Sequence, residues 1–156
     1  MPQEHPTAVD PLRLDAQLCF AVYSAAHAYN RLYRPLLDRL RLTYPQYLVM
    51  LVLWEIDGPT VKTLGKRLLL DSGTLTPLLK RLEAAGLLVR ERSAIDERQV
   101  LIRLTDAGRA LKLEAASVPP VIGGAFGGSQ ADAKLLRETL IDLRDRLNTK
   151  ADTTPA

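Results

Sequence analysis

TVKTLGKRLLLDSGTLTPLLKRLEAAGLLVRERSAIDERQVLIRLT, residues 60–105, is the stretch that decides the fold. Apolar positions at three- and four-residue steps predict a short helix over 61–68 and a second helix from about 72 that stops at Gly86. After this glycine the apolar period falls to two, which predicts an antiparallel hairpin over 87–104. Two helices joined by a short turn and followed by a hairpin form the layout of a winged helix-turn-helix.

Local signals support both helices. Thr60 can cap the first helix, and Asp71 or Ser72 can cap the second. Pro77 falls near the second turn of the second helix, where a proline is tolerated if the carbonyl that it faces lies at or before the cap. One face of this helix is expected to be buried through its leucines, Leu75, Leu78, Leu79 and Leu82.

The segments on either side are also expected to be mostly helical. The fold class is therefore mainly α with a small β-hairpin, a winged helix-turn-helix with N- and C-terminal dimerisation helices. We expect a helix over 12–40 that Pro35 bends or breaks, and then a buried central helix over 45–56. After the hairpin we expect a helix from 105 to about 117 and an amphipathic helix over 131–148. A flexible connection between these two helices contains Pro119, Pro120 and the glycines at 123, 124, 127 and 128.

These elements are expected to form a single domain over 12–148, with a DNA-binding lobe at about 60–105 and mobile tails at 1–11 and 149–156. A winged helix of this size buries little apolar area by itself. The apolar stripes of the terminal helices have little in the same chain to cover them, so a homodimer joined by an intersubunit helical bundle is expected.

Positive charge is concentrated in the decisive stretch. Residues 60–105 hold nine basic and five acidic side chains, whereas the whole chain carries a net charge of only +3. A locally basic segment attracts a phosphate backbone, so double-stranded DNA is the expected partner. A solvated surface of mixed charge is the other interpretation of the same pattern.

Several classes of function lack the residues that they need. One cysteine excludes an intrachain disulfide, and the two histidines, His5 and His27, do not make a metal-ligand cluster. No glycine-rich phosphate loop, apolar run of about 18 residues or signal peptide stands out. We therefore expect a cytoplasmic protein that is not an enzyme, has no metal site or other cofactor and does not enter a membrane.

The helix that begins near Ser72 is the candidate groove-reading element. The small hydroxyls of Ser72, Thr74 and Thr76 suit close approach to a base edge or a phosphate, and free N–H groups at a helix N-terminus favour phosphate. Further along, Lys80 and Arg81 could meet the DNA backbone. A purely structural role is the alternative, in which Ser72 is only a cap and the threonines are ordinary surface residues.

The hairpin tip, residues 93–98, is short and charged. Arg98 could enter the minor groove, where a narrow A·T tract concentrates negative potential. Asp96 could hold the Arg98 guanidinium with both carboxylate oxygens. The alternative is an exposed ion pair that contributes little to stability.

The wing sequence DERQVLIRLT, residues 96–105, resembles the wing signature of the MarR-family transcription regulators. Four more blocks resemble the organic hydroperoxide regulators (OhrR type) of that family: LCFAVYSA at 18–25, YRPLLDRL at 33–40, TYPQYLVMLVLWE at 43–55 and LDSGTLTPLLKRLE at 70–83. The five blocks match in order across about residues 15–119. The resemblance implies an obligate homodimer that represses a peroxidase gene until an organic hydroperoxide oxidises its N-terminal cysteine.

The resemblance also implies roles for single residues. Cys19 matches the reactive cysteine, and Tyr33 and Tyr44 match the two tyrosines that hydrogen-bond it from the partner subunit. Tyr23 matches another nearby tyrosine. Arg98 matches the minor-groove arginine, and the three hydroxyl residues named above fall in the recognition helix.

The chain departs from the two-cysteine members of this family, which resolve the sulfenic acid with a further cysteine toward the C-terminus. Residues 106–156 contain none. The chain therefore resembles the one-cysteine subclass, in which a small thiol or further oxidation completes the switch.

Helix geometry indicates that Cys19 and Tyr33 can meet only between two chains. Cys19 and Tyr33 are 14 residues apart on one helix face, which corresponds to about 21 Å along the axis. The Tyr33 phenol could then reach the sulfur only from an antiparallel or crossing partner helix. Phenol donors favour the thiolate, and an accessible thiolate reacts with a hydroperoxide to give sulfenic acid. Without such donors, a lone cysteine on an apolar helix face is usually an inert core residue.

Rival functions stay open. One is a MarR-like repressor that a small aromatic ligand releases from DNA while Cys19 is silent. Another is a thiol peroxidase, which needs an acid/base or resolving group beside its nucleophile. His27 lies eight residues from Cys19, about 12 Å along the helix, which is too far for that role. A winged helix that binds protein instead of DNA is a further alternative.

Overall fold

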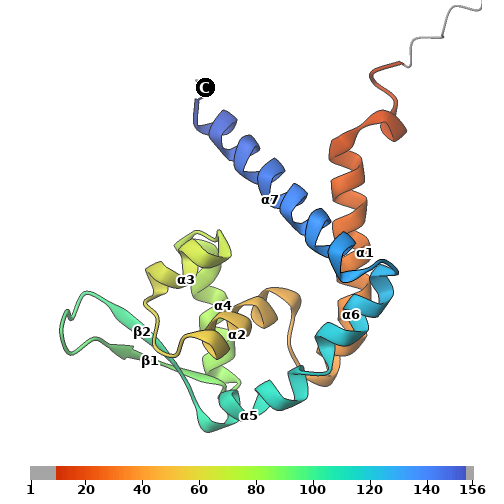
Figure 1. The fold of residues 1–156 in the computed structure, drawn as a ribbon. Helices are drawn as coiled ribbons and strands as arrows, with labels where there is room; N and C mark the ends of the chain where they lie inside the picture. Colours follow the sequence, from red (N-terminus) through yellow and green to blue (C-terminus); the bar gives the residue numbers. More distant parts are fainter. Residues whose placement is uncertain (1–9, 154–156) are drawn as a thin grey trace, which may run out of the picture. The chain divides into compact units, whose positions relative to one another are not determined.

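The computed structural model describes residues 10–153 (Figure 1). It confirms the predicted class, because the described chain is mainly helical with one β-hairpin. The elements in order are η1 (Leu14–Ala16, a 3₁₀ turn), α1 (Leu18–Arg39), α2 (Tyr44–Glu55), α3 (Val61–Leu68), α4 (Ser72–Ala84), β1 (Leu88–Arg92), β2 (Val100–Leu104), α5 (Asp106–Ala115), α6 (Val118–Phe126) and α7 (Gln130–Thr153).

The chain divides into two compact units, residues 1–118 and 119–156. The first unit holds every element from η1 to α5, and the second holds α7 and nearly all of α6. The expected single domain over 12–148 stays a prediction. Most of the expected tails, residues 1–9 and 154–156, lie outside the described residues, whereas 149–153 continue α7 beyond its expected end.

The predicted caps set the helix-turn-helix. The Thr60 hydroxyl accepts a hydrogen bond from the Thr63 backbone N–H at 3.1 Å at the start of α3. Of the two caps considered for α4, Asp71 is the one used, since its carboxylate accepts the Thr74 N–H at 2.9 Å. Between the two helices, Leu69 takes a left-handed backbone conformation with φ of 56°. This turn redirects the chain from α3 into α4.

The hairpin, called the wing below, pairs β1 with β2 in an antiparallel register from Leu88 opposite Leu104 to Arg92 opposite Val100. The chain between α2 and α3 runs along the outer side of β2. There the Gly58 N–H donates to the Ile102 carbonyl at 3.0 Å. The root of the wing is therefore tied by backbone hydrogen bonds to the end of α2.

The core forms around α2, as its almost wholly apolar sequence predicts. Val49 and Met50 are fully buried in this helix, and Leu53 is nearly so. All four leucines predicted to face the core from α4 are buried as well. None of the helices in residues 10–153 is long and apolar enough to cross a membrane.

The expected flexible connection over 119–128 is wrong, because most of it is helix α6. Pro119 and Pro120 occupy the second and third positions of α6, where a backbone N–H would have no intrahelical partner, so prolines cost little there. Pro35 likewise does not end its helix, and α1 continues through it to Arg39.

Helix α5 is joined to α2 by a close contact across Gly108. The Trp54 indole N–H donates to the Gly108 carbonyl at 2.9 Å. A Cβ atom at Gly108 would lie 2.0 Å from the Leu87 carbonyl oxygen. This junction has room only for a glycine because the obstructing atom belongs to the backbone.

We expect Gly108→Ala to destabilise the protein by about 1–3 kcal/mol, because α5 must move away from the Leu87 carbonyl. Ala110→Ser, at an exposed position of the same helix, is the matched control and should change stability by no more than about 0.5 kcal/mol. Urea unfolding followed by circular dichroism measures both. An unfolding midpoint for Gly108→Ala equal to that of the wild type would contradict the tight contact.

Candidate nucleic-acid interface and thiol site

Helix α4 presents a polar face opposite its buried leucines. Ser72, Thr76 and Lys80 follow one another at four-residue steps and therefore lie along one side of the helix. Ser72 and Lys80 are exposed, as is Arg81 beside them, whereas Thr76 is half-buried. Ser72, Lys80 and Arg81 thus share an accessible surface, in which Thr76 is partly covered.

Two of the hydroxyls on this helix already have partners. The Thr74 hydroxyl donates to the Asp71 carboxylate at 2.8 Å, and the Thr76 hydroxyl donates to the Ser72 carbonyl at 2.7 Å. Hydrogen bonds from Thr74, first from its backbone N–H and then from its hydroxyl, lower the pKa of Asp71. The ionised Asp71 carboxylate already accepts the Thr74 N–H, one of the N-terminal donors expected to bind phosphate. Thr74 therefore serves first as part of the helix cap.

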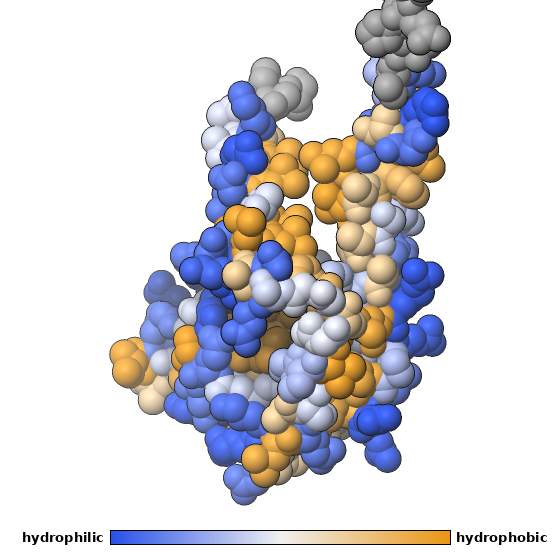
Figure 2. Space-filling view, turned by 45° about the vertical axis from the view of Figure 1, so that its right-hand side comes forward, coloured by the Kyte–Doolittle hydropathy of each residue, from blue (hydrophilic) through white to orange (hydrophobic). Residues whose placement is uncertain are grey.

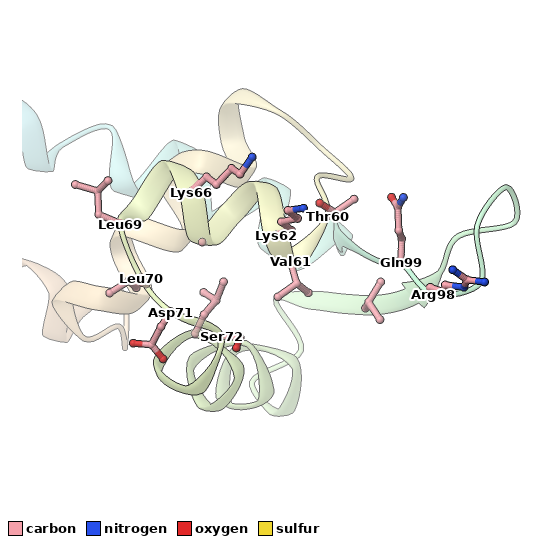
Figure 3. A pocket seen from close by; sticks show the side chains of 13 residues that line it. Thr60, Val61, Lys62, Lys66, Leu69, Leu70, Asp71, Ser72, Arg98 and Gln99 are labelled. Atoms are coloured by element: carbon pink, nitrogen blue, oxygen red, sulfur yellow. The ribbon is translucent and has the colours of Figure 1, made fainter. Parts of the chain in front are cut away.

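A cleft of about 1100 Å³ runs beside this helix start. Figure 3 shows its lining side chains on α3, on the start of α4 and on the edge of the wing, with Leu69 and Arg98 at opposite ends. Lys62 and Lys66, both exposed, line it from one turn to the next of α3. These two lysines were not among the predicted site residues, although their four-residue spacing on a short helix beside the recognition helix was a usable signal.

Side-chain hydrogen bonds hold the wing tip in place. The buried Ser93 hydroxyl accepts the N–H groups of Ile95 at 3.2 Å and of Asp96 at 3.3 Å. The Asp96 carboxylate accepts the Arg98 backbone N–H at 3.1 Å and the Gln99 side-chain amide at 3.0 Å. The expected ion pair between Asp96 and the Arg98 guanidinium is not formed among residues 10–153, because both carboxylate oxygens face these other donors. The exposed guanidinium is left available to an outside anion.

Cys19 lies in the first turn of α1, is exposed and has a free thiol. Tyr23 follows one turn later on the same side of the helix and is 59% exposed. The Tyr23 ring packs on His27, with 4.3 Å between ring centroids. The thiol end of α1 therefore offers an accessible surface within one chain.

A cluster of tyrosines forms near the other end of α1. The ring of Tyr33 lies 4.9 Å from that of Tyr44 at the start of α2 and 6.0 Å from that of Tyr47, measured between centroids. Burial raises the pKa of Tyr33 to about 12, with Tyr44 adding to the rise, and burial also raises the pKa of Tyr44. At neutral pH both phenols keep their protons and can donate hydrogen bonds.

One chain does not complete the predicted redox-sensing site. The structure brings Tyr33 to Tyr44 and places Tyr23 beside Cys19, but the two pairs are separated along α1. The 14 residues between Cys19 and Tyr33 span about 21 Å of helix. Within residues 10–153, no group of three or more histidine, cysteine, aspartate or glutamate side chains is placed to hold a metal ion.

Both long helices expose large apolar side chains (Figure 2). On α7 the exposed ones are Leu135, Leu136, Leu140, Ile141 and Leu147. On α1 they are Leu18, Phe20, Val22, Tyr23 and Tyr29. Apolar surface of this extent on a helix is typical of a contact surface.

Comparison with known proteins connects these features to one family. A family model described as transcriptional regulator SarA/Rot matches residues 31–114. The chain is 56% identical over 145 residues to the HTH-type transcriptional regulator TtmR of Methylorubrum extorquens (strain PA1), covering 93% of this chain and 74% of that protein. It is 48% identical over 141 residues to the organic hydroperoxide resistance transcriptional regulator of Bacillus subtilis (strain 168), covering 90% of this chain and 96% of that protein.

Solved structures agree with the sequence relatives. The overoxidised form of AbfR, a Staphylococcus epidermidis protein, bound to DNA has a TM-score of 0.71 and 38% identity, covering 87% of this chain and 96% of that one. The family model matches more than half of the chain, and the relatives match most of it. The chain therefore belongs to the MarR/SarA family of winged-helix transcriptional regulators, and its relatives include an organic hydroperoxide regulator of that family.

Proposed function

We propose that this protein is a cytoplasmic, homodimeric repressor that binds operator DNA and loses affinity for it when an organic hydroperoxide oxidises Cys19. The observation that carries the proposal is the presence, in one chain, of a cationic winged-helix cleft and a single exposed thiol. The choice of an organic hydroperoxide as the oxidant rests on the relative that is named for organic hydroperoxide resistance.

On DNA, the exposed face of α4 enters the major groove, and Ser72 and Thr76 approach base edges. Lys80 and Arg81 on α4 contact phosphates, as do the lysines of α3 that line the cleft. Arg98 on the wing enters the adjacent minor groove, and Asp96 keeps the wing tip in shape for it.

A second copy of the chain completes the thiol site. The exposed apolar side chains of α1 and α7 would be buried in an intersubunit helical bundle. A crossing partner helix brings the phenols of the partner's Tyr33 and Tyr44 to Cys19. These protonated phenols donate to the sulfur and favour the thiolate.

The chemistry is a two-electron oxidation of sulfur. The Cys19 thiolate attacks the terminal oxygen of the hydroperoxide, the O–O bond breaks and the corresponding alcohol leaves, so that a sulfenic acid remains after proton transfer. A small thiol then displaces this hydroxyl as water and forms a mixed disulfide. The adduct is too bulky for the tyrosine-lined site, so the helices separate and the two winged helices lose their spacing on DNA.

We predict that Cys19→Ser binds the operator like the wild type and ignores cumene hydroperoxide, because it removes the only thiol of the chain. A DNA titration of both proteins before and after peroxide treatment measures this. Release of the Ser variant by peroxide would sink the proposal. Release of both proteins by an aromatic ligand, without oxidation, would favour the ligand-responsive alternative.

Arg98→Ala should weaken operator binding by about 1–3 kcal/mol and leave the fold intact, since the guanidinium is exposed at the wing. Arg137→Ala on α7 removes the same charge outside the winged helix and serves as the matched control. Unchanged affinity of Arg98→Ala at physiological salt would remove Arg98 from the interface.

Treatment with one equivalent of hydroperoxide and a small thiol should add one thiol to each chain, because the chain has no second cysteine to resolve the sulfenic acid. Intact mass spectrometry detects the adduct. A covalent dimer as the main product on a non-reducing gel would show instead that the two Cys19 residues of a dimer lie close together.

A further inference from the structure

The wing tip carries an apolar side chain for which the proposed function has no role. Ile95 is 98% exposed. The proposed helical bundle accounts for the apolar side chains of α1 and α7, but it does not include the wing. A single exposed apolar residue is common on protein surfaces. The exposure of Ile95 therefore gains meaning only from its position and from the way in which its backbone is held.

The backbone beneath Ile95 is fixed before any partner binds. The Ile95 N–H donates to the buried Ser93 hydroxyl, and the next N–H, of Asp96, donates to the same oxygen. Asp96 in turn holds Arg98 and Gln99, and the Gln99 carbonyl accepts the Ser93 N–H at 2.9 Å. Because the tip is held by these hydrogen bonds, the backbone at Ile95 has little conformational entropy left to lose on binding.

The chemistry around Ile95 matches that of a DNA minor groove. Arg98, three residues away, offers a cation to the acceptor atoms on the floor of the groove. The walls of the groove are deoxyribose C–H groups, about 6 Å apart in B-DNA, and they offer an apolar surface instead. A wing tip that carries one guanidinium and one aliphatic side chain on a hydrogen-bonded backbone can therefore contact both the floor and the walls of the groove.

We propose that Ile95 is a second DNA-contacting residue of the wing, which packs on the deoxyribose walls of the minor groove beside Arg98. The inference rests on the proposed function. Because both walls approach the side chain only where the groove is narrow, Ile95 adds recognition of groove width, which A·T tracts provide. The contact is uncharged, so it adds affinity without releasing counterions from the DNA.

The test uses the full-length protein and a duplex selected by the wild type from a random library. Ile95→Ala should bind about tenfold more weakly, which corresponds to about 1.4 kcal/mol. Its dependence of affinity on salt should equal that of the wild type, whereas Arg98→Ala should reduce the salt slope by about 1. Ile95→Leu should restore most of the affinity. Leu113→Ala, which truncates an 82% exposed side chain on α5, is the control and should bind like the wild type.

A second duplex, in which G·C pairs replace the A·T pairs under the wing, should reduce the difference between wild type and Ile95→Ala. Binding of Ile95→Ala within twofold of the wild type would overturn the contact, as would a salt slope lowered as far as in Arg98→Ala. A change in oligomeric state on sedimentation would mean that Ile95 contacts another copy of the chain instead. A wild-type protein that selects no duplex would refute the proposed function itself.

Discussion

The burial of α2 is the constraint on which both candidate sites depend. Val49 and Met50 at its centre have no exposed surface, and close-packed interiors do not let such a helix slide. At its start, Tyr44 packs on Tyr33 of α1. At its end, the Trp54 indole and carbonyl are hydrogen-bonded to α5, and Asp57 accepts the N–H of Leu104 at the base of the wing. The tyrosine cluster and the wing are thus attached to opposite ends of the buried helix α2.

In the candidate interface the basic side chains can attract DNA, whereas the acidic side chains hold local structure in place. Lys62, Lys66 and Arg98 line the cleft and can attract phosphate, which supplies affinity but little sequence information. The acidic side chains do something different. Asp71 caps α4, and Asp96 closes the wing tip, so each carboxylate accepts hydrogen bonds from backbone N–H groups and neighbouring side chains. The negative residues of this basic surface shape the elements that the positive residues use.

In the proposed function, the thiol site is one half of a site that two chains share. Cys19 is exposed at one end of α1, and the half-buried phenols that could stabilise its thiolate lie at the other end. A rigid helix cannot fold back to join them, so only an intermolecular arrangement brings the two halves together. In the proposed dimer, oxidation and subunit packing would be coupled, because a group added to the sulfur would displace side chains of the partner chain.

Much of the fold follows from local sequence patterns. Thr60 and Asp71 cap the helices that follow them, the α4 leucines are buried at helical spacing, and the alternation over 100–104 forms a strand. These features succeed as predictions because their hydrogen bonds and periodicities involve residues within a few positions of one another. The helix α6 escaped prediction because prolines that usually end a helix fit its first turn.

The sequence by itself determined the winged helix-turn-helix, the locally basic surface and the single thiol. Only the tertiary structure decided which side chains meet: Trp54 with Gly108, Tyr33 with Tyr44, and the lysines of α3 with Arg98 along one cleft. It also decided that Asp96 holds Gln99 and the backbone of Arg98 instead of the guanidinium. The physical reason is that contacts between distant residues depend on how whole elements pack, and a competition among several donors for one carboxylate is settled by geometry that residue type and spacing do not specify.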